Sequence, residues 1–83
     1  MDFLLPEIES AVEIKMTRPT MSTRVLGEQL VVDIAKYKKH PYCRTLICIV
    51  YDPEGRITNP RGVENDLKED SDQLSVRVFI VPK

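Results

Sequence analysis

The sequence predicts an α/β domain built on a mixed β-sheet, and three segments carry this prediction. Residues 10–16 alternate apolar and polar side chains with the period of two that is typical of a strand. Residues 23–40 repeat apolar side chains at helical spacing. Residues 44–52 form a nearly continuous β-branched run, typical of a central strand covered on both faces. Strand, helix and buried strand in succession predict a parallel crossover, which is almost always right-handed.

The predicted order of elements is β-β-α-β-(α)-β, with one main helix packed on the sheet. Residues 2–5 form a short apolar strand that ends at Pro6, and the short connection to residue 10 suits a hairpin. One helical turn or two are expected over 63–68. Residues 74–82 form the last strand, and the sequence does not decide whether it runs parallel or antiparallel to its neighbours.

The main helix over 23–40 is predicted from a stripe of apolar side chains, with Pro41 as its stop signal. This stripe comprises Leu26, Leu30, Ile34 and Tyr37. Gly27 lies inside the helix, where glycine lowers stability by about 1 kcal/mol. Two interpretations of Gly27 stay open: a weak point, or a close approach of the helix to the sheet.

Composition indicates one globular domain with a net charge close to zero. The chain has 83 residues, of which 42% are hydrophobic and 30% charged, and its formal net charge is −1. Net charge therefore predicts neither a nucleic-acid partner nor a membrane partner. No apolar run approaches the ~18 residues of a membrane span, and no basic segment precedes the first apolar residues. We expect a cytoplasmic protein without a membrane partner.

Two charged side chains occupy one face of the strand over 10–16. Because side chains alternate along a strand, Glu13 and Lys15 share a face with Ala11. The opposite, apolar face carries Val12, Ile14 and Met16. Pairing Leu5 with Ser10 in the predicted hairpin places Phe3 opposite Val12 on the apolar face, and Asp2 opposite Glu13.

Two carboxylates beside a lysine suit a hard divalent cation. Mg²⁺ takes oxygen ligands and often binds through one or two carboxylates together with a phosphate substrate. Lys15 would then stabilise negative charge that develops on the phosphate. The Asp-x10-Glu-x-Lys spacing alone favours a simpler interpretation, in which Glu13 and Lys15 form a solvated ion pair worth about 0–1 kcal/mol.

A wider resemblance supports the catalytic interpretation. The stretches DFLL, VEIKMTR, LGEQLVVDIAKYKKHP, RTLICIVYDPEGRITNPRGVENDL and LSVRVFIVP resemble the PD-(D/E)XK nuclease superfamily, and within it the restriction-endonuclease domain of DpnII/MboI-like proteins. The resemblance covers nearly the whole chain and implies a restriction-endonuclease-like mixed sheet. It also implies a DNA substrate and Mg²⁺, for which Mn²⁺ can substitute.

The resemblance assigns roles to particular residues. It implies that Asp2 and Glu13 bind Mg²⁺ with help from the Ile14 carbonyl, and that Lys15 serves phosphodiester hydrolysis. Gln29, and less specifically Glu28, match a polar position on the following helix. Four arginines are candidates for phosphate contacts, although a solvated surface explains each of them equally well: Arg18, Arg24, Arg56 and Arg61.

The family core begins earlier, with a helix and a strand ahead of the Asp. We therefore expect residues 1–83 to form a single truncated or minimal domain. Strand 2–5 would then be an exposed apolar edge, and we expect a homodimer that covers it. The lead hypothesis is a Mg²⁺-dependent DNA nuclease domain. The alternatives are a catalytically inactive remnant acting as a binding or oligomerisation module, and a fragment completed by another polypeptide.

Overall fold

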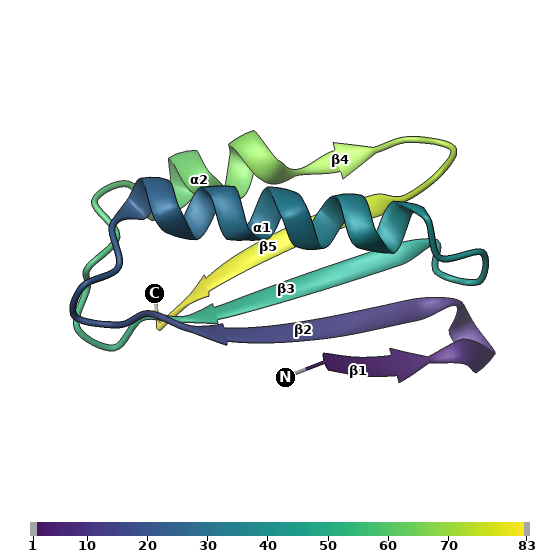
Figure 1. Cartoon of the computed structure of the whole chain (residues 1–83), viewed down its shortest axis with the longest axis horizontal. Coiled ribbons are helices and arrows are strands. Elements are labelled where there is room, and N and C mark those ends of the chain that lie inside the picture. The colour runs from purple at the N-terminus through teal and green to yellow at the C-terminus, as the bar shows by residue number, and fades with distance from the viewer. Residues whose placement is uncertain (1, 83) are drawn as a thin grey trace.

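A five-stranded mixed sheet and two helices make up the fold of the computed structural model, which describes residues 2–82 (Figure 1). The strands are β1 (Asp2–Leu5), β2 (Ser10–Met16), β3 (Thr45–Tyr51), β4 (Glu69–Asp70) and β5 (Ser75–Val81). The helices are α1 (Thr23–Lys38) and α2 (Pro60–Leu67), and a short 3₁₀ turn, η1 (Pro6–Ile8), joins β1 to β2. This architecture confirms the predicted α/β class and the order of its main elements.

The sheet has the order β1-β2-β3-β5-β4. Strands β2, β3 and β5 are parallel neighbours, whereas β1 and β4 pair antiparallel at the two edges. The predicted parallel crossover through the main helix is therefore present between β2 and β3. The last strand, whose direction was open, runs parallel to β3.

Local sequence signals explain where the helices begin. The Ser22 side chain caps α1 by accepting a hydrogen bond of 3.1 Å from the Val25 backbone N–H. Helix α2 begins at Pro60 rather than at residue 63, because Asn59 accepts a 3.1 Å hydrogen bond from the Gly62 N–H. The main helix ends at Lys38, two residues before the predicted end. The two-residue strand β4 was not predicted.

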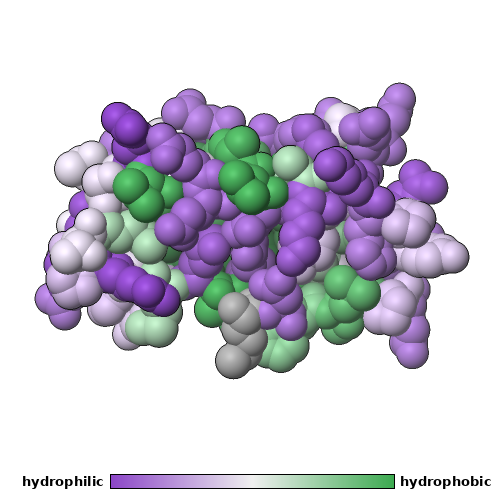
Figure 2. Space-filling model, in the orientation of Figure 1, coloured by the Kyte–Doolittle hydropathy of each residue, from purple (hydrophilic) through white to green (hydrophobic). Residues whose placement is uncertain are grey.

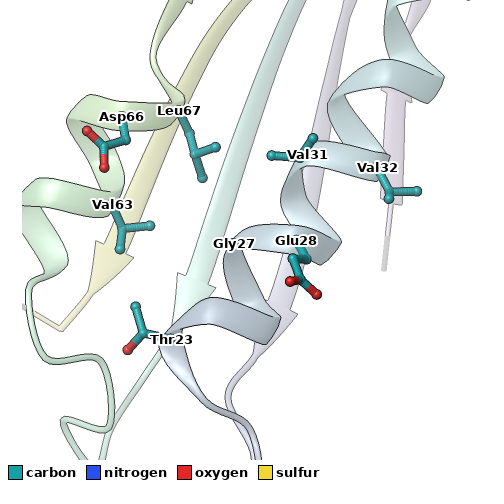
Figure 3. Close-up of a pocket in the computed structure, with 8 residues that line it drawn as sticks. All are labelled: Thr23, Gly27, Glu28, Val31, Val32, Val63, Asp66 and Leu67. Carbon is teal, nitrogen blue, oxygen red and sulfur yellow. The ribbon is translucent and has the colours of Figure 1, made fainter.

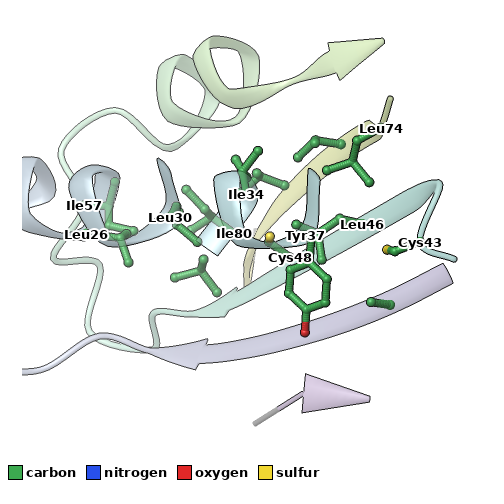
Figure 4. Packing of buried hydrophobic residues seen from close by; sticks show 14 residues of the cluster. Leu26, Leu30, Ile34, Tyr37, Cys43, Leu46, Cys48, Ile57, Leu74 and Ile80 are labelled. Atoms are coloured by element: carbon green, nitrogen blue, oxygen red, sulfur yellow. The ribbon is translucent and has the colours of Figure 1, made fainter. Parts of the chain in front are cut away.

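The hydrophobic core lies between the helices and one face of the sheet (Figure 4). The predicted stripe of α1 is buried, and Leu26 and Leu30 are fully so. Helix α2 adds Val63 and Leu67 at the margin of the same core. From the sheet, the core takes alternate positions of β2, β3 and β5: Ala11, Leu46, Cys48, Val50, Val76, Val78 and Ile80. We call this side of the sheet the covered face.

The choice of covered face corrects one prediction. The positions expected to form the apolar face, Val12, Ile14 and Met16, lie on the opposite side of the sheet, which neither helix covers. The helices instead cover the face that carries Ala11, Glu13 and Lys15. Ala11 is fully buried and belongs to the core. The two charged side chains, Glu13 and Lys15, have partners on the same face, as described below.

Strand β3 is central in the sheet but buried on only one face, which corrects the prediction of two-sided burial. Its remaining residues belong to what we call the open face. This face comprises the second set of alternate positions, including Val12, Ile14 and Met16 of β2 and Ile47, Ile49 and Tyr51 of β3.

A shallow groove separates the two helices on the covered side (Figure 3). Val31 of α1 faces Val63 and Leu67 of α2 across it. Gly27 lies on its wall, and a Cβ added there would meet nothing within 4 Å. Gly27 is thus a weak point of the helix and does not mark a close approach of the helix to the sheet.

The outer surface in the orientation of Figure 1 is mainly hydrophilic, with hydrophobic residues in separate patches (Figure 2). Within residues 2–82, no helix is both long and apolar enough to cross a membrane.

Candidate active site

The hairpin of β1 and β2 brings together the acidic residues identified in the sequence. Its register pairs Leu5 with Ser10 and therefore places Asp2 directly opposite Glu13, as strand parity predicts. Lys15 follows two residues later on the same face. These three side chains lie on the covered face, beneath α1.

Helix α1 supplies a fourth charged group that the sequence analysis did not identify. Oδ2 of Asp33 lies 2.9 Å from Nζ of Lys15, and Oε1 of Glu13 lies 3.7 Å from the same nitrogen. The side chains of Lys15 and Asp33 are each 22% exposed, so water screens this ion pair only partly. Lys15 is held between a carboxylate from its own strand and one from the helix above.

A second contact joins the same helix to Asp2. The Tyr37 hydroxyl donates a hydrogen bond of 3.0 Å to Oδ2 of Asp2. The ring belongs to the core and reaches from α1 toward β2 and β1 (Figure 4). The helix thus holds in place a carboxylate of the edge strand β1.

Burial and neighbouring charge perturb the carboxyl group of Glu13. The residue is 5% exposed. Burial, followed by the hydrogen bond and negative charge of Asp33, raises the pKa of Glu13 to about 7, although the Lys15 charge acts in the opposite direction. The Cys48 thiol, 3.9 Å away, donates to Oε2 of Glu13. At neutral pH, the protonated and the ionised forms of Glu13 are therefore both populated.

The partners of Glu13 remain charged. Burial acts to raise the pKa of Asp33, but hydrogen bonds from Glu13 and Lys15 outweigh it and lower that pKa. Burial acts to lower the pKa of Lys15, but the hydrogen bond and charge of Asp33 outweigh it and raise that pKa. Asp33 is accordingly a carboxylate and Lys15 an ammonium at neutral pH.

A pocket of about 480 Å³ opens beside Lys15, at the end of β2. It brings two further predicted residues, Arg18 and Gln29, next to Lys15. Ile14, Met16 and Met21 complete its lining. Glu28, the less specific candidate on α1, lines a neighbouring depression together with Gln29 and Asp33.

The other candidate arginines lie elsewhere on the surface. Arg24 forms an exposed ion pair of 3.1 Å with Glu28, one helical turn away. Arg61 belongs to α2 and lines a separate pocket with Glu64 and Ile80. Arg56 is exposed in the loop after β3, where its backbone N–H donates to Asp52. The structure therefore groups only Arg18 with the acidic site.

The oxygen donors of the site suit a hard divalent cation in chemical type. Asp2 and Glu13 are carboxylate donors on adjacent strands. Oδ2 of Asp33 is a further buried carboxylate oxygen beside them, 2.9 Å from Nζ of Lys15. Residues 2–82 contain no group of three His, Cys, Asp or Glu side chains already arranged around a common metal position.

Asp33 and Tyr37 are the site residues that sequence reasoning missed. Tyr37 was assigned to the apolar stripe, and its burial confirms that assignment, but its hydroxyl serves the site as well. One signal could have identified both residues. Gln29, Asp33 and Tyr37 recur every four residues on the helix that follows the Glu-x-Lys strand, so they share one face.

The fold and the site together define a restriction-endonuclease-like α/β domain, in which an Asp and a Glu-x-Lys pair on neighbouring strands lie beneath a helix. The sequence model of the DpnII-MboI restriction endonuclease family (REase_DpnII-MboI) matches residues 1–83, and the chain belongs to this family. No curated protein and no solved structure gives a match. Restriction endonucleases are nucleases that act on DNA and usually use divalent metals.

Proposed function

We propose that this chain is a Mg²⁺-dependent endonuclease domain that hydrolyses phosphodiester bonds of DNA. The observation that carries the proposal is the meeting of Asp2, Glu13 and Lys15 on one face of the β1–β2 hairpin. Membership of a restriction endonuclease family gives this cluster its chemical context.

Lys15 is the residue that acts on the phosphate in this proposal. Its ammonium group stabilises the negative charge that develops on phosphate oxygens as the nucleophile attacks. Asp33, 2.9 Å away, keeps Lys15 protonated and fixes its position. An ammonium already oriented by the protein requires little reorganisation during the reaction.

Asp2 and Glu13, together with the Ile14 carbonyl, are the proposed donors to Mg²⁺ or Mn²⁺. A bound metal supplies a Lewis acid for a phosphoryl oxygen and lowers the pKa of a coordinated water. Glu13 must lose its proton to bind a cation, and its pKa of about 7 allows this near neutral pH. Tyr37 holds the Asp2 carboxylate in place through its 3.0 Å hydrogen bond.

The pocket beside Lys15 is the proposed position for the scissile phosphate. Gln29 on its wall can donate a hydrogen bond to the attacking water or accept one from it, and Arg18 can contact a neighbouring phosphate. Arg24, Arg56 and Arg61 are proposed only as weaker backbone contacts to DNA, because they lie outside this pocket.

The alternative function is a catalytically inactive remnant that serves as a small binding or oligomerisation module. The observation that supports it is the ion pair of Lys15 with Asp33, 2.9 Å apart, which can serve stability alone. In either case we propose that residues 1–83 act as one domain. We also propose that the edge strand β1, whose four residues are all exposed, pairs with a second copy of the chain.

A metal titration monitored by NMR separates the two functions. Under the nuclease proposal, millimolar Mg²⁺ shifts the amide signals of β1 and β2 around Asp2, Glu13 and Lys15, and Mn²⁺ broadens them. Glu13→Gln abolishes these changes, because the amide cannot replace a carboxylate ligand. The matched control Glu7→Gln, on the exposed η1 turn, leaves them intact. If the wild-type signals stay unmoved by either metal, the nuclease proposal is rejected and the binding-module alternative stands.

A further inference from the structure

A buried carboxylate that the proposed mechanism does not use lies at the carboxyl end of β3. Asp52 directly follows this strand and is 5% exposed. The Thr17 hydroxyl donates to its Oδ1 at 2.9 Å, and the backbone N–H groups of Arg56 and Ile57 donate to Oδ1 and Oδ2 at 2.9 and 3.0 Å. Burial acts to raise the pKa of Asp52, but these hydrogen bonds outweigh it and lower that pKa. Asp52 is therefore a carboxylate at neutral pH.

The two backbone bonds to this carboxylate belong to the turn that follows β3. The Gly55 N–H donates to the Asp52 carbonyl at 3.3 Å, and Gly55 takes a positive φ of 63°. Arg56 and Ile57 come directly after Gly55, so their bonds to the carboxylate complete the local turn. The bond from Thr17 has no such local explanation, because Thr17 is 35 residues away and follows β2. It links the loop after one strand to the loop after its neighbour.

The two linked segments are residues 17–22, which we call the Arg18 loop, and residues 52–59, which we call the Asp52 loop. Because β2 and β3 are parallel and pair up to their last residues, both loops start at the same edge of the sheet (Figure 1). The Thr17 backbone N–H also donates to the carbonyl of the last residue of β3 at 3.1 Å. Beyond the other end of the Arg18 loop, Oγ1 of Thr23 accepts a 3.4 Å hydrogen bond from the Thr58 N–H. The Arg18 loop is therefore tied to its neighbours at both ends.

The Arg18 loop carries the arginine that the structure groups with the acidic site. Arg18 comes directly after Thr17 and lines the pocket beside Lys15, together with Met21 of the same loop. The Met21 N–H donates to the Arg18 carbonyl at 3.0 Å, which folds the loop into a turn. The Arg18 side chain extends from this loop and is exposed. The bond from Thr17 to Asp52 therefore fixes the backbone that presents Arg18 to the pocket.

We infer that Thr17 and Asp52 are positioning residues, whose hydrogen bond holds the Arg18 loop so that Arg18 contacts the DNA phosphate next to the scissile one. The inference rests on the proposed nuclease function. Neither positioning residue touches the reacting phosphate, and both act through Arg18. A loop that is already ordered in the free protein loses less conformational entropy when the substrate binds. Loss of the bond should therefore weaken substrate binding and raise KM, with little change in kcat.

Substitutions of Thr17 test this role. Thr17→Val removes the hydroxyl, keeps the shape of the side chain, and should leave the turn around Asp52 intact. Thr17→Ser restores the hydroxyl. The matched control is Thr20→Val, which removes the hydroxyl of an exposed threonine in the same loop. Kinetics of plasmid nicking with Mg²⁺ give KM and kcat, and far-UV circular dichroism verifies the fold of each variant. Any unfolded fraction lowers the apparent kcat but leaves KM unchanged.

Thr17→Val should raise KM by about tenfold and keep kcat within about twofold of the wild type. Thr17→Ser and Thr20→Val should keep the KM of the wild type. In an Arg18→Ala background, Thr17→Val should raise KM no further, because the residue through which Thr17 acts is already absent. A bond that serves stability alone would lower the melting temperature and leave KM unchanged.

Three results overturn the inference. The first is a Thr17→Val variant with the KM of the wild type. The second is an equal rise of KM in Thr17→Ser or Thr20→Val, which shows that the bond to Asp52 is not the cause. The third is the full rise of KM when Thr17→Val is combined with Arg18→Ala, which shows that Thr17 does not act through Arg18. Each of these results is obtained with an active wild type and leaves the proposed function standing. A wild type that nicks no plasmid rejects the proposed function and this inference with it.

Discussion

The two faces of the sheet have similar apolar content but different roles. On the covered face, Leu46 and Val76 are fully buried, and the same face holds Glu13 and Lys15. On the open face, Ile47 and Ile49 alternate with these buried positions along β3 but remain partly accessible. Apolar alternation therefore marks a strand without indicating which face the helices will cover.

The comparison also explains how a charged cluster is accommodated at the edge of a core. Glu13 and Lys15 are tolerated on the covered face because α1 places Asp33 above Lys15 and Tyr37 above Asp2. A charged pair on a covered face, with partners supplied by the covering helix, is more typical of a functional site than of a stabilising ion pair.

Two neighbouring residues of β3 give the largest expected contrast between the faces. Leu46→Ala removes a fully buried side chain from the covered face and should lower the free energy of unfolding by about 2–5 kcal/mol. Ile47→Ala on the open face should lower it by about 1 kcal/mol, because Ile47 contacts water there. Urea unfolding measures both changes. Equal losses would mean that the open face is covered as fully as the face beneath the helices.

The raised pKa of Glu13 predicts a pH-dependent stability of the metal-free chain. The pKa rises from 4.5 to about 7 on folding, so the folded state binds this proton more tightly than the unfolded state. The resulting stabilisation is complete below pH 4.5 and is lost as the pH rises to about 7. Glu13→Gln removes this loss and should make the variant more stable than the wild type at pH 8, by an amount of order 2–3 kcal/mol.

Thermal unfolding between pH 4 and pH 8 measures this effect, with Glu7→Gln on η1 as the exposed control. Parallel stability profiles for the wild type and Glu13→Gln would show that burial and Asp33 do not perturb Glu13.

Asp33 should affect catalysis through Lys15. Asp33→Asn keeps the size of the side chain but removes the charge that lies 2.9 Å from Nζ. DNA cleavage should fall by about 10- to 100-fold, the range typical of residues that orient an active-site group. The pH optimum of cleavage should also move, because the Lys15 ammonium is less stabilised without Asp33 and loses its proton at lower pH. Asp66→Asn, an exposed carboxylate of α2, is the control. Unchanged cleavage in Asp33→Asn would show that Asp33 has no role in catalysis.

The smallest expected effect concerns the helical side of the covered face. Gly27→Ala should raise the free energy of unfolding by about 0.5–1 kcal/mol, because alanine favours the helix and the added Cβ meets no atom within 4 Å. Urea unfolding measures the change. A destabilised Gly27→Ala variant would show that α1 approaches its neighbours more closely than the groove of Figure 3 indicates.

The fold was largely predictable because local signals agree with tertiary structure in most elements. Alternation in residues 10–16 and the helical stripe from Leu26 to Tyr37 both correspond to observed elements. The register of Asp2 with Glu13 followed from hairpin length and parity alone. Strand β4 was not predictable, because two residues carry no periodicity and depend on pairing with β5.

The site was only partly predictable for a different reason. Asp2, Glu13 and Lys15 are close in the hairpin, so strand geometry brings them together. Asp33 and Tyr37 reach them through a helix packed across the sheet, and each contact with Lys15 or Asp2 depends on that packing. The side covered by α1 was itself mispredicted, because Val12, Ile14 and Met16 offer more apolar surface than Ala11, Glu13 and Lys15. The family match does not depend on this choice.

The most direct test of the central claim, that the covered face carries a nuclease site, is nicking of supercoiled plasmid with Mg²⁺ or Mn²⁺. The wild type should nick the plasmid only with metal, and Lys15→Met should abolish nicking while keeping the fold. Lys68→Met, which removes an exposed lysine after α2, should nick like the wild type. Nicking that persists in Lys15→Met, or a purified wild type that never nicks with either metal, would contradict the account.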